Sequence, residues 1–419
     1  MLNRFCALAF SLALASAFPA QAQPAQQQRP LVKIVATGGT IANSPSGRMG
    51  VDTVLAQIPE ISNYARIEVV DLFRVGSAAI TLQNWLDLSS TVNQIFATEP
   101  GVSGIVVTHG SNTSEETAYF LSLTVNSAKP VVLTAAQRQQ NTLGQEGTRN
   151  LFDAIRVAAD PSAAGKGAMV VVNEKIHPAR DVTKRISVRV ETWESGDAGV
   201  LGLVDSEKVT FYNQPVYKHT TRSDVRLPAG IMRADQLPRV DILYAYADTD
   251  GLLAEAAVKA GARALVIAGF PTGAATPAQN QVLNRLRDQG TVVIMSNRGG
   301  LGRINGDNPF ISADNLTPQK ARILAMLALA KNPKVSLTID DNTFPHKVLL
   351  IRGSARLQPV EGIVPEYIAA AERYFGREQG EAWIEQLRKM IPSMVKITIT
   401  PEWVGLLDFQ TRFPSALSA

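Results

Sequence analysis

Residues 104–121 read GIVVTHGSNTSEETAYFL, and this stretch decides the fold because it sets a buried strand directly before a helix. Its first five residues form an apolar run without alternation, as a parallel strand buried on both faces requires. After the turn at Gly110, Ser or Asn followed three residues later by Glu is typical of a helix start. Glu115 and Glu116 suit the positive end of the helix dipole. The stretch therefore predicts one strand and one helix of an α/β sheet.

The same order repeats along the chain on both sides of this stretch. Strands are expected at Leu31–Ala36, Ile67–Leu72, Gly104–Thr108, Val131–Thr134, Ala168–Val172, Ile242–Tyr246, Ala264–Ala268 and Val292–Ser296. Helices are expected at Leu82–Phe96, Thr113–Val125, Thr148–Ala159 and Gly251–Ala260. Alternating strands and helices predict an α/β fold with a mainly parallel sheet and right-handed crossovers.

The residues after Pro333 follow a different pattern. Alternating strands are expected at Val335–Asp340, Lys347–Leu357 and Val395–Thr400, with a single helix near Val364–Lys389 among them. Trp383 and Trp403 are expected to fill the core of this small α+β appendage. The expected division of the chain is a signal peptide at 1–22, a flexible leader at 23–30, a first α/β domain at 31–212, a linker at 213–238, a second domain at 239–333 and the appendage at 334–419.

The amino terminus has the features of a secretory signal peptide. Arg4 precedes an apolar run, and Ala20-Gln21-Ala22 is an A-x-A cleavage site. The run is too short for a membrane span, so we expect export to a bacterial periplasm and no membrane association after cleavage; an uncleaved anchor is the alternative. The only cysteine, Cys6, would be removed, so the mature protein would have no disulfide.

Composition excludes two classes of protein. The 419 residues are 45% hydrophobic and 19% charged, which is not the composition of a long disordered chain. The 41 Lys and Arg residues are scattered and nearly balanced by 37 Asp and Glu residues, so no nucleic-acid partner is expected.

Two polar segments follow expected parallel strands, at the edge where open α/β sheets bind ligands. Residues 37–42, TGGTIA, combine a tight glycine turn with the hydroxyl of Thr40. A strand-to-helix turn capped by Thr is the alternative, and the segment lacks the Gly-Lys-Ser/Thr ending of a phosphate loop. In the second segment, His109 is more typical of a hydrogen-bonded structural histidine than of a base, and Ser111 has no structural explanation.

A third polar segment, residues 180–184 (RDVTK), ends in a lysine, Lys184. Lys184 could serve as the base of a serine hydroxyl if burial lowers its pKa, although a loop lysine is most often a solvated charge. The four histidines show no metal-ligand spacing.

Together, these segments resemble the bacterial type II asparaginases and glutaminase-asparaginases over residues 31–331. The resemblance is carried by TGGTIA at 37–42, VVTHGSNTSEETAYFL at 106–121, KPVVLTAAQR at 129–138, ARDVTK at 179–184 and LTPQKARILAMLALA at 316–330. It implies a larger amino-terminal and a smaller carboxyl-terminal α/β domain, and a homotetramer whose active sites form between subunits. It also implies a small amide substrate and no metal or other cofactor.

The resemblance assigns roles to individual residues. Thr40 matches the threonine that attacks the side-chain amide and forms an acyl-enzyme with release of ammonia. Ser111 stands at the second active-site threonine, and Lys184 matches the lysine that pairs with it. Ser77 matches the serine that holds the substrate α-carboxylate, and backbone N–H groups near Thr40 and Ser111 would form the oxyanion hole. The further substrate-binding residues implied are Gly39, Gly110 and Asn112.

Several positions depart from the family pattern, and they gather around the α-ammonium site and the lid. Asn112 stands where the family has an aspartate that binds the α-ammonium, and residues 43–50 contain no match for the lid tyrosine. Ala78 and Thr272 replace a usual Gln and Asn, and residues 303–309 lack the glutamate expected from a neighbouring subunit. We therefore expect a threonine amidohydrolase that has drifted from free L-asparagine toward amides without a free α-ammonium.

Two other readings stay open at this point. A binding or scaffold protein could keep the fold without turnover. The run from 335 to 414 also resembles the carboxyl-terminal half of the pyridoxamine-phosphate-oxidase-like split barrels, which makes a flavin or deazaflavin oxidoreductase a further alternative. Because only half of that barrel is visible, a structural or oligomerisation role is the expected one for the tail.

Overall fold

The computed structural model describes residues 29–228, 230–304, 309–331, 334–340 and 347–408. The expected signal peptide and almost all of the leader lie outside the described residues. No helix among the described residues has the length and apolar character needed to cross a membrane.

The first domain is built on an eight-stranded sheet in the order β12-β11-β8-β7-β6-β5-β1-β4. Its strands are β1 (Leu31–Gly38), β4 (Arg66–Val75), β5 (Val102–Thr108), β6 (Val131–Thr134), β7 (Ala168–Val172), β8 (Lys175–Pro178), β11 (Gly202–Val204) and β12 (Val209–Phe211). The five strands from β4 to β7 are parallel, as the continuous apolar runs predict. Strands β8, β11 and β12 extend the sheet in antiparallel fashion. This edge was not expected from the sequence.

Helices cover both faces of this sheet. Helices α1 (Val51–Leu55) and α4 (Gly147–Ala159) pack on one face, while α2 (Leu82–Thr98) and α3 (Ser114–Thr124) pack on the other. Successive residues of β1 alternate between the two cores: Ile34 belongs to the first and Val35 to the second, and both are fully buried. Burial on both faces explains why the strands show no polar alternation.

The path of the chain reverses at β1. From β1 the chain moves outward to the edge strand β4 and then returns across β1 to β5 on its other side. Such a reversal leaves a crevice at the carboxyl ends of the two strands that flank it, where ligands bind in open α/β sheets. Residues 39–42 follow β1 and residues 109–113 follow β5, so both polar segments lie at this point.

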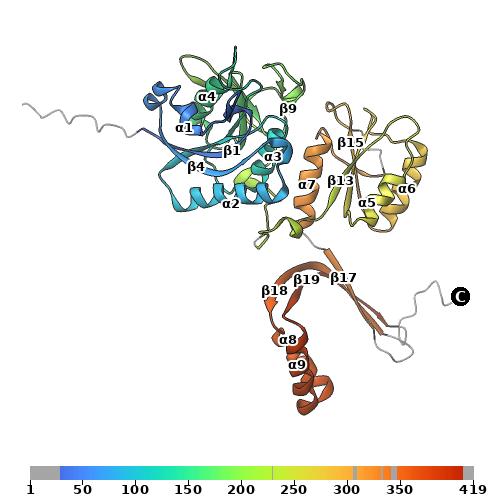
Figure 1. Ribbon diagram of the computed structural model, residues 1–419. Helices are drawn as coiled ribbons and strands as arrows, with labels where there is room; N and C mark the ends of the chain where they lie inside the picture. Colours follow the sequence, from blue (N-terminus) through green and yellow to red (C-terminus); the bar gives the residue numbers. More distant parts are fainter. Residues whose placement is uncertain (1–28, 229, 305–308, 332–333, 341–346, 409–419) are drawn as a thin grey trace, which may run out of the picture.

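The second domain contains a smaller parallel sheet in the order β13-β14-β15-β16. Its elements are β13 (Val240–Tyr244), α5 (Leu252–Lys259), β14 (Ala264–Gly269), α6 (Pro277–Asp288), β15 (Val292–Asn297), β16 (Ile311–Ser312) and α7 (Pro318–Lys331). Helix α7 lies between this sheet and helix α3 of the first domain (Figure 1), and one apolar core includes residues of both domains. The two domains therefore pack directly on each other.

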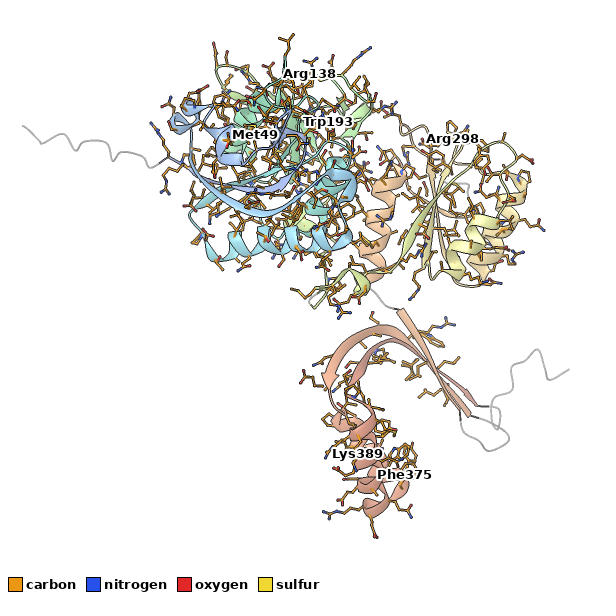
Figure 2. The ribbon with its side chains drawn as sticks, viewed as in Figure 1. Met49, Arg138, Trp193, Arg298, Phe375 and Lys389 are labelled. Carbon is orange, nitrogen blue, oxygen red and sulfur yellow. The ribbon has the colours of Figure 1, made fainter. Side chains whose placement is uncertain are left out.

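Short elements complete the first domain beside this contact. The two-residue strands are β2 (Asn43–Ser44), β3 (Gly47–Arg48), β9 (Thr183–Lys184) and β10 (Trp193–Glu194). Strands β2 and β3 form one small hairpin, and β9 pairs with β10 through Lys184 opposite Trp193. Figure 2 labels Met49, just after the first hairpin, and Trp193 in the second.

The tail is an antiparallel three-stranded sheet with two helices. It comprises β17 (Lys334–Asp340), β18 (Lys347–Glu361), α8 (Pro365–Phe375), α9 (Arg377–Met390) and β19 (Ser393–Asp408). The expected single helix is wrong, because Gly376 adopts a φ of 76° and separates two helices. Figure 2 shows Phe375 and Lys389 on this helix pair, away from the two larger domains.

The expected roles of the two tail tryptophans are also wrong. Trp383 is 37% exposed and Trp403 is 48% exposed, so neither fills a core. The two rings instead lie against neighbours at the surface: Trp383 beside Phe375, with ring centroids 6.4 Å apart, and Trp403 beneath the guanidinium of Arg352. A sheet of three strands has too little interior to enclose them.

The other expected strands and helices are confirmed, most of them within two residues at each end. The longer differences are at β4, β18 and β19, which continue three, four and eight residues further than expected.

Candidate active site

The two polar segments touch through their glycines. Gly39 has a φ of +91°, and a Cβ built on it would lie 2.3 Å from the backbone nitrogen of Gly110. A Cβ on Gly110 would lie 2.6 Å from the hydroxyl oxygen of Ser77. Only residues without side chains permit this approach. The contact places Thr40, the next residue after Gly39, and Ser111, the next after Gly110, at the same edge of the sheet.

Ser77 follows β4, and its hydrogen bonds join the end of this strand to the segment after β5. Its hydroxyl accepts a hydrogen bond from the backbone N–H of Asn112 at 3.1 Å. Its carbonyl accepts one from the hydroxyl of Thr113 at 2.8 Å. Ser77 is buried, whereas the side chain of Asn112 is exposed. Three adjacent parallel strands thus deliver one polar group each.

Lys184 reaches this edge from β9. Its Nζ donates a hydrogen bond to the hydroxyl oxygen of Ser111 at 2.8 Å. The Ser111 hydroxyl in turn donates to Oε1 of Gln137 at 3.3 Å, a longer and weaker bond. Nε2 of Gln137 is buried and has no partner among the described residues. The Ser111 oxygen therefore lies between one amine and one amide.

The environment of Lys184 lowers the pKa of its amine. Burial lowers the pKa of the Lys184 amine, and the negative charge of Glu115 raises it again in part. Glu115, in the first turn of α3, accepts a hydrogen bond from the backbone N–H of Lys184 at 3.2 Å. Burial also raises the pKa of Glu115, against the opposing charge of Lys320. A lowered pKa makes the neutral amine, the form that can accept a proton from a neighbouring hydroxyl, easier to reach.

His109 has a structural role, as expected. It is fully buried; its Nδ1 pairs with the Gly110 carbonyl at 2.8 Å and its Nε2 with the Thr117 hydroxyl at 3.0 Å. Burial lowers the pKa of His109 to about 4, so the ring is neutral at pH 7. Because Nδ1 faces a carbonyl, it is the donor, and Nε2 accepts from Thr117.

The structure thus brings together Gly39, Gly110, Ser77, Ser111 and Lys184, as the sequence predicted. Thr40 begins a short 3₁₀ helix (Thr40–Ala42) and is half-buried, and its hydroxyl has no hydrogen-bond partner among the described residues. A hydroxyl without such a partner, one residue after the Gly39–Gly110 contact, is available to a ligand.

Sequence reasoning missed three polar groups at this site. Glu115 was explained by the helix dipole, yet it is 8% exposed and contacts the lysine segment. Gln137 and Lys320 belong to the strings that carry the family resemblance, but the sequence assigns neither a role. No short-range pattern marks them, because their partners lie 26 or more residues away.

Two cavities lie near these residues. One of about 180 Å³ lies beside the carboxyl ends of β1 and β4, between the sheet and the segment that holds Met49. One of about 910 Å³ lies between the two domains and is bordered by α3, α7 and the segment around Arg180. No group of three or more His, Cys, Asp or Glu side chains gathers as metal ligands would within the described part of the chain.

Comparison with known proteins places this geometry in a family. Residues 31–217 match the family model described as Asparaginase, N-terminal, and residues 239–337 match the Glutaminase/Asparaginase C-terminal domain. The chain is 37% identical to L-asparaginase 2 of Bacillus subtilis over 317 residues, covering 72% of this chain and 83% of the relative. It is 36% identical over 324 residues to a protein of Haemophilus influenzae named Probable L-asparaginase periplasmic, covering 73% of this chain and 91% of the relative.

A solved structure shows the same fold. The crystal structure titled Probable Cytoplasmic L-asparaginase from Campylobacter jejuni matches with a TM-score of 0.68 and 36% sequence identity, covering 72% of this chain and 96% of that one. The resemblance of the tail to a split barrel stays a prediction. Over its two α/β domains, the chain belongs to the asparaginase family of hydrolases that act on amides.

Proposed function

We propose that this protein hydrolyses the side-chain amide of asparagine or a related small amide, with Thr40 as nucleophile and Ser111 and Lys184 as its proton-transfer pair. The observation that carries the proposal is the 2.8 Å hydrogen bond from Lys184 to Ser111, at the point where Gly39 packs on Gly110. This arrangement puts a free hydroxyl, a second hydroxyl and a partly buried amine at one sheet edge.

The reaction follows from these three groups. The Thr40 oxygen attacks the amide carbonyl carbon, and backbone N–H groups near Thr40 and Ser111 stabilise the developing oxyanion. The hydroxyl proton passes by way of Ser111 to neutral Lys184 and then to the leaving nitrogen, so ammonia departs and an ester to Thr40 remains. Water then attacks this ester, the bond to Thr40 breaks, and Thr40 regains a proton as the carboxylate product leaves.

The first test is ammonia release by protein that starts at Gln23, with L-asparagine, D-asparagine, L-glutamine and succinamic acid as substrates. Thr40→Ala should abolish turnover while leaving the fold intact. Thr53→Ala, the same change at an exposed position of α1, is the matched control and should keep full activity. Binding of an amide without turnover by the wild type would instead favour a binding protein that has kept the fold.

The choice of substrate depends on Asn112. Its backbone is fixed by the bond to Ser77, and its exposed side chain is an uncharged amide. Where a carboxylate would bind an α-ammonium through a charge-assisted bond of about 1.5–3 kcal/mol, a neutral amide gives a weaker one. We therefore expect a preference for amides that lack a free α-ammonium, such as succinamic acid or an N-acylated asparagine.

Restoring the charge tests this preference. Asn112→Asp should raise kcat/KM for L-asparagine by about tenfold or more, while leaving succinamic acid unchanged or less favoured. Asn112→Ser, which removes the amide without adding charge, is the control. No gain with L-asparagine for Asn112→Asp would contradict the drift in substrate.

Export and assembly complete the proposal. Residues 1–22 support secretion, and periplasmic material should begin at Gln23 when its amino terminus is sequenced. A homotetramer follows from the family resemblance, and light scattering coupled to size exclusion would measure it. A mature amino terminus at Met1 or a stable monomer would contradict these two parts separately.

A further inference from the structure

The segment that carries Lys184 has little packing on one side. Residues 178–181 border the interdomain cavity of about 910 Å³, whose other wall is formed largely by α7. A segment beside a cavity of this size lacks the close neighbours that normally fix a side chain in a core. Ala179 and Val182 are buried in the apolar core on the other side of the segment, so specific polar contacts are left to fix the side that faces the cavity.

Lys320 supplies two of these contacts from the other domain. It lies in the first turn of α7 and is 1% exposed. Its Nζ donates hydrogen bonds to the carbonyl of Arg180 at 2.8 Å and to the carbonyl of Val182. Asn315, just before α7, adds a third contact by accepting a hydrogen bond from the Arg180 guanidinium at 2.7 Å.

Glu115 holds the same segment from the opposite side. Its carboxylate accepts the backbone N–H of Lys184 at 3.2 Å and also bonds the Thr183 side chain. Glu115 and Lys320 attract each other. After burial, the charge of each residue has the largest effect on the pKa of the other. The Lys320 ammonium from the second domain thus binds two backbone carbonyls of residues 180–184, and the Glu115 carboxylate from α3 binds a backbone N–H of the same segment.

We propose that Lys320 and Glu115 are positioning residues for the Lys184–Ser111 pair, so that docking of the second domain sets the geometry of the proton-transfer site in the first. The inference rests on the proposed function for its effect on turnover. The placement of Lys184 itself does not depend on that function.

The charges around Lys184 give the two residues opposite effects on its titration. The charged groups around the segment are Glu115 and Glu116 from α3, Lys320 from α7, Arg180, Asp181 and Arg185 within the loop, and Glu194 from β10. Burial is the largest influence on the Lys184 pKa and lowers it, while Glu115 raises it. Loosening the segment should therefore raise the pKa of Lys184, whereas neutralising Glu115 in place should lower it.

The experiment measures Lys184 directly. Full-length mature protein is labelled with acetic anhydride across a pH series, and the modification of Lys184 is quantified by mass spectrometry. In Lys320→Met, which keeps the aliphatic stem, labelling of Lys184 should begin at higher pH than in wild type, and kcat should fall about 100-fold with KM changed less than about threefold. In Glu115→Gln, which keeps an acceptor oxygen, labelling should begin at lower pH.

Controls separate positioning from general damage. Lys259→Met, the same substitution at an exposed position of α5 in the same domain, should change neither labelling nor kcat. If Lys320→Met fails to fold, Glu115→Gln tests the inference by itself, because labelling of Lys184 should then begin at lower pH than in wild type. Unchanged Lys184 labelling in folded variants of both residues would overturn the inference. If wild-type protein releases no ammonia from any amide, the proposed function fails while the labelling result still decides the positioning.

Discussion

At the residue scale, the contact between Gly39 and Gly110 limits what position 39 can hold. Gly39→Ala would place a methyl group 2.3 Å from the Gly110 nitrogen at a φ of +91°. Overpacking costs about 1–3 kcal/mol and the left-handed conformation about 1–2 kcal/mol, so we expect a loss of about 3 kcal/mol in urea unfolding and a large loss of turnover.

Gly47→Ala is the matched control for this substitution. Gly47 has a φ of +120° but no neighbouring atom within 4 Å of an added Cβ. It therefore carries the backbone cost without the clash, and it should lose less stability than Gly39→Ala. Equal losses in the two variants would show that the contact between the strand ends contributes little.

Also at this scale, the buried histidine His109 makes stability depend on pH. Its pKa is about 4 when folded, against an ordinary value of 6.5. The stabilising contribution is complete above pH 6.5 and is lost as the pH falls toward 4, because the unfolded chain takes up a proton that the folded one does not. At pH 5 this amounts to about 2 kcal/mol relative to pH 7.

Urea unfolding at pH 7 and pH 5 measures this dependence. His109→Asn removes the titrating ring and should show a smaller loss between the two pH values than wild type. His177, whose pKa burial lowers to about 3, contributes in the same direction and stays in both proteins. The same loss in wild type and variant would contradict a buried neutral His109.

At the scale of elements, a chain of hydrogen bonds joins α2, α3 and the end of β5. The Trp85 indole N–H donates to the Thr117 hydroxyl at 2.8 Å, and this hydroxyl donates to Nε2 of His109 at 3.0 Å. All three side chains are buried. These two hydrogen bonds hold the end of β5, and with it the turn that contains Ser111, in place against α2 and α3.

Thr117→Val should break both bonds at nearly constant volume. Two buried polar groups would lose their partner, at about 1–3 kcal/mol each, so we expect a loss of about 2–6 kcal/mol in thermal or urea unfolding. Thr98→Val, at the exposed end of α2, is the control and should cost far less. A near-neutral Thr117→Val would mean that another group takes over the two bonds.

At the scale of the whole molecule, the tail makes its main contacts within itself. Strand β18 pairs with β17 and β19, and α8 packs on α9. One face of this sheet is apolar and open: Leu337 and Val404 both lie opposite Ile351, and Leu337, Val404 and Leu406 are 38%, 56% and 62% exposed. An open apolar face of this kind promotes association.

Removing residues 338–419 should therefore leave the active site intact. We expect kcat and KM for the best amide within about twofold of the full chain, together with weaker binding of a hydrophobic dye and less self-association in light scattering. A loss of turnover in a folded truncated protein would show that the tail contributes to the site. Unchanged dye binding would show that the open face is not the apolar surface that the dye detects.

Local sequence determined most of the fold and the main polar groups of the candidate site. The apolar runs of β1, β5, β6 and β7 had to be buried parallel strands because they show no alternation, and strand ends of one sheet meet at one edge. The strand pattern alone therefore predicts that Thr40 and Ser111 lie at one edge of the sheet. The tail helix was predicted as one because Gly376 was not recognised as the residue that ends the first helix.

Only the tertiary structure decided what surrounds Lys184. Its bond to Ser111 spans 73 residues, and the contact of Lys320 with Val182 spans 138. No local pattern carries such information, because the pKa of a lysine depends on its burial and on the charges that folding brings near it. The sequence supplied an amine and a hydroxyl of the right kinds, and the packing of two domains made them a pair.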